Sequence, residues 1–467
     1  MHYISTRGAQ GGPFSEVLMQ ALAKDGGLYV PDHFPDLSDL VARNSVLPYC
    51  QITERLINAF APELDPAEVQ NIVHSTYTKD RFGSWWITPL EWLDDTTAIL
   101  RLSGGPTHSF KDVALQLVVR LMSYELARQG KRLTLIVATS GDTGGAAAEA
   151  VRDLPNIDLY VLIPTGRITE FQRRQMTTIR ADNVTIISVD APFDTLQAMI
   201  KSVLNDPDFV ARHRIGGVNS INWGRIMAQT AYWISAFLQV KERHPDVHRI
   251  TAAVPTGNFG DVYSAYVARQ CGFPIDLLVC TNENDVLDEL FQTGVYRPRG
   301  DAEVVQTTSP SMDIQVASNA ERMFFDAVDR DPMRLAALMG ELKSKGRIAL
   351  DPQKLHAMGF SSGGATEADV MLAMRGCHEE QGRLFDPHTA VAMSVVNEKM
   401  PEGIVVVAET ALPVKFADAV SRATGIIPPL SAAQQAMMSA REHVVSFTRA
   451  DAGLLKQFIA SHGRVSV

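Results

Sequence analysis

Cysteine is scarce in this chain of 467 residues, and the four that occur are widely separated: Cys50, Cys271, Cys280 and Cys377. Their spacings match neither a metal-binding pair nor a disulfide framework. The sequence also has no uninterrupted apolar run long enough to span a bilayer. Its first residues lack the basic stretch and apolar core of a secretory signal. We therefore expect a cytoplasmic protein in a reducing setting, without a membrane partner.

An excess of positive charge is also missing, because 53 acidic residues outnumber 43 lysines and arginines and the net charge is −10. This balance argues against nucleic acid and against an anionic membrane surface as partners. A hydrophobic content of 46% and a charged content of 21% are typical of a soluble globular protein. The chain is too long for one hydrophobic core, so we expect two or three domains.

Most of the chain alternates short apolar runs with helical patterns, which predicts an α/β protein with parallel sheets. Apolar runs typical of buried strands stand at Leu133–Ala138, Leu159–Ile163, Val184–Val189, Ile250–Val254, Asp276–Cys280 and Ile404–Ala408. Thr97–Leu102 predicts one more strand. Residues 1–90 show mainly amphipathic helices, beginning with Phe14–Ala23. Residues 320–400 predict further helices with a break at Gly359–Gly364.

One lysine stands at a predicted junction of loop and helix. The stretch Ser103–Asp112 reads Ser-Gly-Gly-Pro-Thr-His-Ser-Phe-Lys-Asp and precedes a mostly apolar helix over Val113–Ala127. The positive end of a helix and partial burial both favour the neutral amine, so Lys111 could act as a nucleophile. From this stretch alone, a surface lysine in a first helical turn is the more common interpretation, because Asp112 by itself complements the helix dipole.

Two further junctions of strand and helix are rich in glycine. They read Ser140-Gly-Asp-Thr-Gly-Gly145 and Thr256-Gly-Asn-Phe-Gly260. Glycine lets the backbone approach an anion, and the following helix supplies aligned N–H donors. Neither loop has the Walker or the dinucleotide-binding spacing. Loops at the carboxyl ends of parallel strands meet at one edge, so the pattern favours a ligand with two anionic groups, such as a phosphorylated cofactor and an acidic substrate.

Five motifs together resemble the threonine synthase family. They are Gly-Pro-Thr-His-Ser-Phe-Lys-Asp ending at Asp112, Thr-Ser-Gly-Asp-Thr-Gly ending at Gly144, Asn-Ser-Ile-Asn-Trp-Gly-Arg ending at Arg225, Pro-Thr-Gly-Asn-Phe-Gly-Asp ending at Asp261, and Ser-Pro-Ser-Met-Asp-Ile-Gln-Val ending at Val316. The resemblance runs from Tyr3 to Phe416, and five motifs in the family's order are far more specific than any one of them. That family belongs to the pyridoxal-phosphate enzymes that share the tryptophan synthase β-subunit fold.

The resemblance implies a fold and a domain division. The fold is α/β, with two parallel or mixed sheet lobes that hold the cofactor between them. A mostly helical N-terminal domain would cover residues 1–90 and a smaller α/β lobe residues 111–240. The larger, cofactor-binding lobe would combine residues 91–110 and 241–467.

The resemblance also implies an activity and its residues. O-phospho-L-homoserine and water would give L-threonine and phosphate by γ-elimination and β-addition, in a monomer or homodimer without a metal. Lys111 would bind pyridoxal 5'-phosphate as a Schiff base and move protons on the substrate. The implied cofactor-binding residues are Lys111, Asp142, Gly257, Asn258, Phe259, Gly260 and Thr410, the last facing the pyridine nitrogen. The implied substrate-binding residues are Thr107, Ser140, Thr143, Asn222 and Arg225.

Two positions depart from the family's pattern. Ser103-Gly104 stands where these enzymes usually have Phe-His, and Leu412 replaces a histidine expected after Thr410-Ala. One interpretation is neutral drift around an intact cofactor site. Another is a threonine-synthase-like phospho-lyase that stops at a 2-oxo acid, or a γ/β-replacement enzyme on a related phosphorylated amino acid. The intact Lys111 argues against a third interpretation, a relative without catalytic activity.

Four other polar positions have a functional and a structural interpretation, and we expect the structural one for each. His108 is predicted to be an exposed loop histidine and His388 to be bonded within a turn. The pair Arg173-Arg174 is predicted to lie on a solvated helix face. Asp313 is predicted to order the Ser-Pro-Ser-Met-Asp loop.

Overall fold

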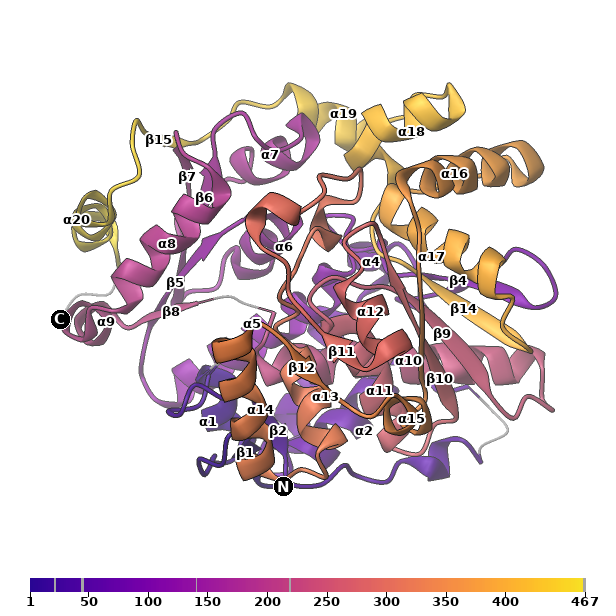
Figure 1. Cartoon of the computed structure of the whole chain (residues 1–467). Coiled ribbons are helices and arrows are strands. Elements are labelled where there is room, and N and C mark those ends of the chain that lie inside the picture. Colours follow the sequence, from indigo (N-terminus) through magenta and orange to yellow (C-terminus); the bar gives the residue numbers. More distant parts are fainter. Residues whose placement is uncertain (21, 43–45, 140, 218–219, 465–467) are drawn as a thin grey trace. The chain divides into compact units, whose positions relative to one another are not determined.

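A computed structural model describes residues 1–20, 22–42, 46–139, 141–217 and 220–464, apart from the side chain of residue 301. The chain forms two compact units: residues 1–104 with 220–428, and residues 105–219 with 429–467. Each unit contains one large sheet covered by helices (Figure 1). The mixed α/β fold predicted from the sequence is confirmed, whereas the three-part domain division stays a prediction.

The larger unit holds a six-stranded sheet. Its order is β13 (Phe360–Gly364), β10 (Ile275–Thr281), β9 (Ile250–Pro255), β14 (Ile404–Glu409), β4 (Thr97–Arg101) and β3 (Leu90–Trp92). Neighbouring strands are parallel except β3, which runs antiparallel to β4. The loops after β4, β9, β10 and β14 therefore share one edge of the sheet, where ligands of parallel sheets bind.

Helices and short strands complete the larger unit. Its N-terminal part contains β1 (Tyr3–Ser5), α1 (Phe14–Met19), β2 (Tyr29–Pro31), η1 (Ser38–Leu40), α2 (Tyr49–Phe60), α3 (Pro66–Thr76) and α4 (Lys79–Phe82). Its later part contains α10 (Trp223–Arg243), α11 (Gly260–Gln270), α12 (Val286–Thr293), β11 (Val295–Tyr296), η2 (Asp301–Glu303), η3 (Pro310–Met312), α13 (Ala320–Ala327), α14 (Pro332–Lys345), β12 (Ile348–Ala349), α15 (Pro352–Ala357), α16 (Glu367–Gln381), α17 (Pro387–Lys399), η4 (Pro413–Phe416) and α18 (Ala417–Thr424).

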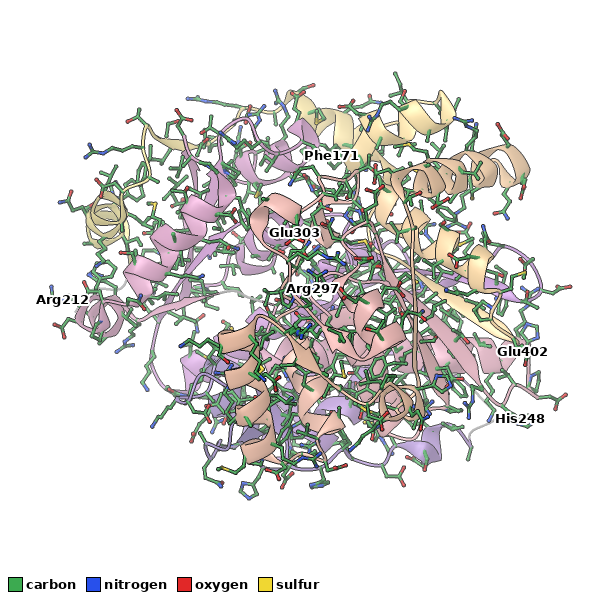
Figure 2. All side chains as sticks on the ribbon, viewed as in Figure 1. Phe171, Arg212, His248, Arg297, Glu303 and Glu402 are labelled. Atoms are coloured by element: carbon green, nitrogen blue, oxygen red, sulfur yellow. The ribbon has the colours of Figure 1, made fainter. Side chains whose placement is uncertain are left out.

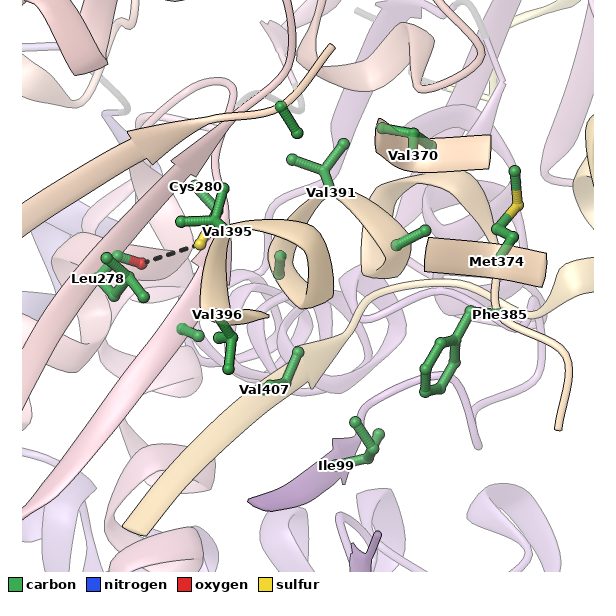
Figure 3. Packing of buried hydrophobic residues seen from close by; sticks show 14 of the residues in the cluster. Ile99, Leu278, Cys280, Val370, Met374, Phe385, Val391, Val395, Val396 and Val407 are labelled. Atoms are coloured by element: carbon green, nitrogen blue, oxygen red, sulfur yellow. Dashed lines mark hydrogen bonds between the residues drawn. The ribbon is translucent and has the colours of Figure 1, made fainter. Parts of the chain in front are cut away.

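One core cluster of the larger unit fixes α17 on the sheet. Val391 and Val395 of α17 pack with Cys280 of β10 and Val407 of β14, and Met374 of α16 closes the cluster (Figure 3). All five side chains are fully buried. Burial of one such side chain contributes about 1.5–3 kcal/mol, so this layer holds α17 firmly against the sheet.

The smaller unit holds a five-stranded, wholly parallel sheet. Its order is β15 (Val445–Phe447), β7 (Val184–Val189), β6 (Ile157–Pro164), β5 (Leu133–Ala138) and β8 (Ile215–Gly217). Its helices are α5 (Lys111–Arg128), α6 (Asp142–Val151), α7 (Glu170–Thr177), α8 (Phe193–Leu204), α9 (Pro207–His213), α19 (Ala432–Ser439) and α20 (Ala452–His462). The C-terminal segment thus returns to this unit, because β15 pairs with β7.

The structure corrects one sequence-based element. The break predicted at Gly359–Gly364 is the edge strand β13, which pairs in parallel with β10. Its sequence, Phe-Ser-Ser-Gly-Gly, has low intrinsic strand preference, so tertiary pairing determines its conformation. Within the described part of the chain, no helix combines the length and apolar character that a bilayer crossing requires.

Candidate active site

Lys111 is the first residue of α5, at the loop–helix junction predicted from the sequence. Its side chain is only 12% exposed, and Nζ lies 3.5 Å from Oδ2 of Asp142. The ammonium also lies 4.7 Å from the ring centroid of Phe110, a distance typical of a cation–π contact. Lys111 is therefore not a surface lysine but a partly buried amine held between a ring and a carboxylate.

Asp142 begins α6, directly after the loop that follows β5. Its Oδ1 accepts a hydrogen bond of 2.9 Å from Nε2 of Gln172, which leaves Oδ2 facing Lys111. The sequence did not single out Gln172, because its role depends on the packing of α7 against α6. Thr143 follows in the first turn of α6 and is half-buried. Ser140 lies outside the described residues.

The loop before Lys111 is fixed by side chains of the same unit. Asp112 accepts hydrogen bonds of 2.7 Å from both the N–H and the hydroxyl of Thr107. The Thr107 carbonyl in turn accepts one of 2.9 Å from Nε2 of Gln175. A Cβ atom at Gly105 would lie 2.5 Å from Cβ of Asp112, so only glycine fits there. The hydroxyl of Thr107 thus serves the loop itself.

In the larger unit, the segment Thr256–Gly260 connects β9 to α11 as a tight glycine loop. A Cβ atom at Gly257 would lie 2.6 Å from the carbonyl oxygen of Ser311, and Phe259 adopts a left-handed φ of 64°. Among the described residues, no acceptor pairs with the backbone N–H groups of Gly257, Asn258 and Phe259. A cluster of free N–H donors at a helix N-terminus is a ready-made phosphate site. The anion-binding loop predicted from the glycines is therefore present, both in its backbone shape and in its N–H donors. This loop, Thr256–Gly260, is called the cradle below.

Arg225 lies in the first turn of α10 and is 4% exposed. Within the described part of the chain, its guanidinium forms no ion pair or hydrogen bond, and its Nε is fully buried. Burial lowers the pKa of Arg225 to about 10. A buried cation that has no partner among the described residues costs free energy, and a bound anion would lower that cost.

Asn222 is the N-cap of α10, and both ends of its amide are already used. Its Oδ1 accepts a hydrogen bond of 2.8 Å from the N–H of Gly224. Its Nδ2 donates one of 2.8 Å to the carbonyl of Leu18. Asn222 therefore fixes the start of the helix that carries Arg225.

The carboxyl ends of β14 and β4 hold a buried carboxylate that the sequence did not reveal. Glu409 is the last residue of β14 and accepts a hydrogen bond from the hydroxyl of Ser103. Arg101 Nε lies 3.5 Å away and Arg383 Nη2 lies 3.4 Å away. Burial raises the pKa of Glu409, while the two arginines and Ser103 oppose that shift. An acidic residue that ends an apolar strand was the available sequence signal. Thr410, which follows it, is buried.

The two departures from the family's pattern have different structural settings. At Gly104 a Cβ atom would lie 2.7 Å from the carbonyl oxygen of Phe82, so the backbone leaves no room for a side chain. Ser103 uses its hydroxyl on Glu409. Leu412 stands in extended conformation at the start of η4 and is half-buried.

Two of the structural interpretations hold, and two are wrong. His388 is bonded through Nδ1 to Asp386 at 2.8 Å within a turn, as predicted. Asp313 orders its loop as predicted, accepting hydrogen bonds from Thr307, Asn282 and Asn284.

Arg173 and Arg174 do not lie on a freely solvated face of α7, because both are half-buried and each pairs with Glu442 beyond α19. His108 is half-buried rather than exposed, because Nε2 is bonded to Gln434 at 3.1 Å.

A cavity of about 640 Å³ lies at the opposite edge of the six-stranded sheet, where β9 and β14 begin. His248 and Glu402 belong to its lining and lie at the same end of the strands (Figure 2). None of the predicted site residues lines this cavity, so the candidate site is defined by the loops at the carboxyl ends and not by this cavity.

Comparisons with known proteins agree with these loops. Family models match residues 2–77 (threonine synthase N terminus), residues 85–410 (pyridoxal-phosphate dependent enzyme) and residues 389–459 (threonine synthase, C-terminal). Threonine synthase of Methylobacillus glycogenes is 39% identical, over 99% of this chain and 100% of its own length. The enzyme of Corynebacterium glutamicum is 41% identical, over 98% of both chains.

A solved structure shows the same likeness in three dimensions. The crystal structure of pyridoxal-phosphate-bound threonine synthase from Brucella melitensis has a TM-score of 0.94 and 38% identity, and the match covers 99% of this chain and 100% of that one. The chain therefore belongs to the threonine synthase family of pyridoxal-phosphate-dependent enzymes.

Proposed function

We propose that this protein converts O-phospho-L-homoserine and water into L-threonine and phosphate, with pyridoxal 5'-phosphate as its cofactor. The observation that carries the proposal is the loop Thr256–Gly260 at the start of α11, in which the N–H groups of Gly257, Asn258 and Phe259 meet no acceptor among the described residues. The close approach of Gly257 to the Ser311 carbonyl shows that the loop has no room for a side chain at that position. These features fit a phosphate group, as the family requires.

The bound cofactor supplies an electron sink that acidifies the substrate's carbon-bound hydrogens. We propose that Lys111 is the residue that would hold the cofactor covalently, and that its Nζ holds and transfers protons of the substrate. Asp142 keeps Nζ in place, because its Oδ2 lies 3.5 Å away and Gln172 fixes the other carboxylate oxygen. The burial of Lys111 limits the water around the amine, which preserves its reactivity.

Two anion-binding elements divide the binding task. The cofactor phosphate would be held by the backbone N–H groups of Gly257, Asn258, Phe259 and Gly260. Arg225 binds the substrate phosphate, since a guanidinium pairs with phosphate through two parallel hydrogen bonds. Asn222 supports Arg225 by capping α10, because its own amide is bonded to Gly224 and Leu18.

The remaining predicted roles stay proposals. Thr410 faces the pyridine nitrogen from the end of β14. Thr107 shapes the lysine loop for the substrate carboxylate, and Thr143 contacts that carboxylate from the first turn of α6. The role of Ser140 rests on its motif alone.

The setting of the enzyme is also a proposal. Four cysteines that form no disulfide and a net charge of −10 support a cytoplasmic protein that does not bind nucleic acid. It acts as a monomer or homodimer. The separate family match over residues 2–77 supports an N-terminal domain within residues 1–90. Lobes over 111–240 and over 91–110 with 241–467 complete the proposed division.

A second candidate is a phospho-lyase or a γ/β-replacement enzyme on a related phosphorylated amino acid. The observation that favours it is the absence of both expected histidines, since Gly104 has no room for a side chain and Leu412 is apolar. A missing imidazole removes a group that could assist water addition. Under this candidate the organic product is a 2-oxo acid or a substituted amino acid.

The test is to follow phosphate release and the organic product together. Purified holoenzyme is given O-phospho-L-homoserine, beside the variants Lys111→Ala and Lys131→Ala. We expect stoichiometric phosphate and threonine from the wild type, and a loss of at least about a thousandfold in Lys111→Ala because the bonding amine is gone. Lys131→Ala is the matched control, since Lys131 is exposed and, among the described residues, its side chain is bonded only to Gln129. Phosphate with a 2-oxo acid as sole organic product supports the second candidate. Absence of phosphate release contradicts the first candidate, because it shows that O-phospho-L-homoserine is not the substrate.

A further inference from the structure

The motif Ser-Pro-Ser-Met-Asp-Ile-Gln-Val lies in a segment, residues 307–319, that packs directly behind the loop Thr256–Gly260. A Cβ atom at Gly257 would lie 2.6 Å from the Ser311 carbonyl oxygen and 3.2 Å from Cα of Met312. The segment is itself rigid, because Asp313 binds Thr307 through both carboxylate oxygens. Residues 307–319 are therefore the back wall of the cradle.

Asn319, at the end of this wall, controls the direction of one peptide group in the cradle. Its backbone N–H and its Nδ2 both donate to the carbonyl of Asn258, each at 3.1 Å. The carbonyl and N–H of a planar trans peptide point in opposite directions. Fixing the Asn258 carbonyl toward Asn319 therefore turns the N–H of Phe259 away from the wall, where no described residue accepts it.

Arg322 holds Asn319 from behind. Its Nη1 donates to Oδ1 of Asn319, its Nε donates to the Tyr29 carbonyl at 3.0 Å, and its Nη2 donates to the Ile221 carbonyl at 2.6 Å. Arg322 is 0% exposed, and burial lowers its pKa to about 10. All three acceptors are uncharged oxygens, so this buried cation is not neutralised by the groups that it binds.

The neighbouring carboxylate does not change this conclusion. Glu321 is bonded to Thr6 at 2.7 Å and to Arg7 through both of its oxygens. Its charge is therefore already paired. Arg322 also reaches Ile221, the residue before the N-cap Asn222, so one guanidinium connects the cradle wall to the start of the helix that carries Arg225.

We propose that Asn319 is a positioning residue for the cofactor phosphate, aimed by Arg322, whose buried charge favours the phosphate dianion in the cradle. This inference rests on the proposed function, because it assumes that the loop Thr256–Gly260 binds that phosphate. It assigns a function to Asn319, three residues after the motif that ends at Val316. It also explains why Arg322 is fully buried although no carboxylate among the described residues is bonded to it.

The test compares two ligands that differ only in the phosphate. Full-length protein freed of cofactor is titrated with pyridoxal 5'-phosphate and with pyridoxal, and the absorbance of the lysine adduct gives each affinity. In Asn319→Ala we expect pyridoxal 5'-phosphate to bind about tenfold more weakly or worse, because the Asn258 carbonyl loses one of its two donors and the loop relaxes. The affinity for pyridoxal should change less than about twofold, since it has no group for the cradle.

Two further variants protect the test against misfolding. Asn319→Asp has the same shape but loses both side-chain donors and adds a negative charge, so its loss for pyridoxal 5'-phosphate should exceed that of Asn319→Ala. Asn183→Ala is the matched control, because Asn183 is also buried and donates to the carbonyls of Val151, Leu154 and Ile157 in the other unit. That control should lower the thermal midpoint and leave the ratio of the two affinities unchanged.

The outcomes separate the inference from the function on which it rests. If the wild type binds no pyridoxal 5'-phosphate, the proposed function is wrong. If the wild type binds it and the Asn319 variants bind it equally well, the positioning role is wrong. A loss of the same size for both ligands would also overturn that role, because it would show a general change in the site.

Discussion

The ammonium nitrogen of Lys111 lies 3.5 Å from a carboxylate oxygen of Asp142, and each residue is the first of its helix. Two residues 31 positions apart are thereby brought together at adjacent helix N-termini. Gln172 holds the second oxygen of Asp142, so the carboxylate has a fixed orientation toward the amine. The arrangement gives the predicted Schiff-base lysine a defined partner.

Asp142→Asn tests this partnership. A charge-assisted hydrogen bond contributes about 1.5–3 kcal/mol, so we expect kcat to fall about tenfold to a hundredfold with little change in KM. Steady-state kinetics on O-phospho-L-homoserine checks it. Asp153→Asn is the control, because Asp153 is exposed and pairs with Arg152. An unchanged kcat in Asp142→Asn would show that the amine needs no carboxylate.

Arg225→Met tests the unpaired buried cation. The pKa of Arg225 in the folded protein is about 10, which lies below the ordinary arginine value. The charged guanidinium therefore destabilises the folded state at neutral pH, and this cost decreases only above about pH 10. Removing the charge should therefore raise the thermal midpoint of the ligand-free protein by about 2–6 °C.

The same variant should lose its response to an anion. Inorganic phosphate should raise the midpoint of the wild type and raise that of Arg225→Met less, because ligand binding stabilises only a protein that has the site. Arg243→Met, at the other end of α10, should respond to phosphate as the wild type does. A lower thermal midpoint in ligand-free Arg225→Met than in the wild type would show that the charge of Arg225 does not destabilise the ligand-free protein.

Glu409→Gln tests the buried carboxylate. A raised pKa means that the folded protein takes up the proton at higher pH than the unfolded chain, so stability falls as pH rises from below the ordinary glutamate value through the raised one. The glutamine keeps a partner for Ser103 and removes this titration. We expect the difference in thermal midpoint between variant and wild type to grow from acid to neutral pH. A difference independent of pH would count against a raised pKa.

Gly104→Ala tests the close approach at one of the two departures. The new Cβ would lie 2.7 Å from the Phe82 carbonyl oxygen, so we expect a loss of about 1–3 kcal/mol in the free energy of unfolding. Gly376→Ala is the control, and we expect it to raise the free energy of unfolding. Gly376 lies within α16 with open space around it, and alanine stabilises a helix by about 1 kcal/mol relative to glycine. Denaturant unfolding of both variants checks the pair. Equal stability of Gly104→Ala and wild type would show that a side chain fits there.

The sequence predicted the elements whose own residues determine them. Strands β5 and β7 were predicted with their observed bounds, because continuous apolar runs suit strands buried on both faces. β13 was not, because its serines and glycines become a strand only through pairing with β10. β15 and β8 are similarly short and depend on a neighbour.

The parts of the site also differ in whether local residues or distant partners determine them. The lysine junction and the glycine loop follow from local residues, so both could be recognised from the sequence. Ser103 and Glu409 are 306 positions apart, and the contact of Asn319 with Asn258 spans 61 positions. Partners that meet only in the folded chain leave no local pattern, which is why these contacts required the structure.

A reaction in heavy-oxygen water tests most directly whether this protein forms threonine from O-phospho-L-homoserine and water. Holoenzyme is incubated with O-phospho-L-homoserine in that water, and the amino acid product is analysed by mass spectrometry beside the released phosphate. If this chain is a complete threonine-forming enzyme, threonine equals phosphate in amount and carries one heavy oxygen, on its β-hydroxyl. Phosphate release with unlabelled threonine, or with a 2-oxo acid and no threonine, would contradict that claim.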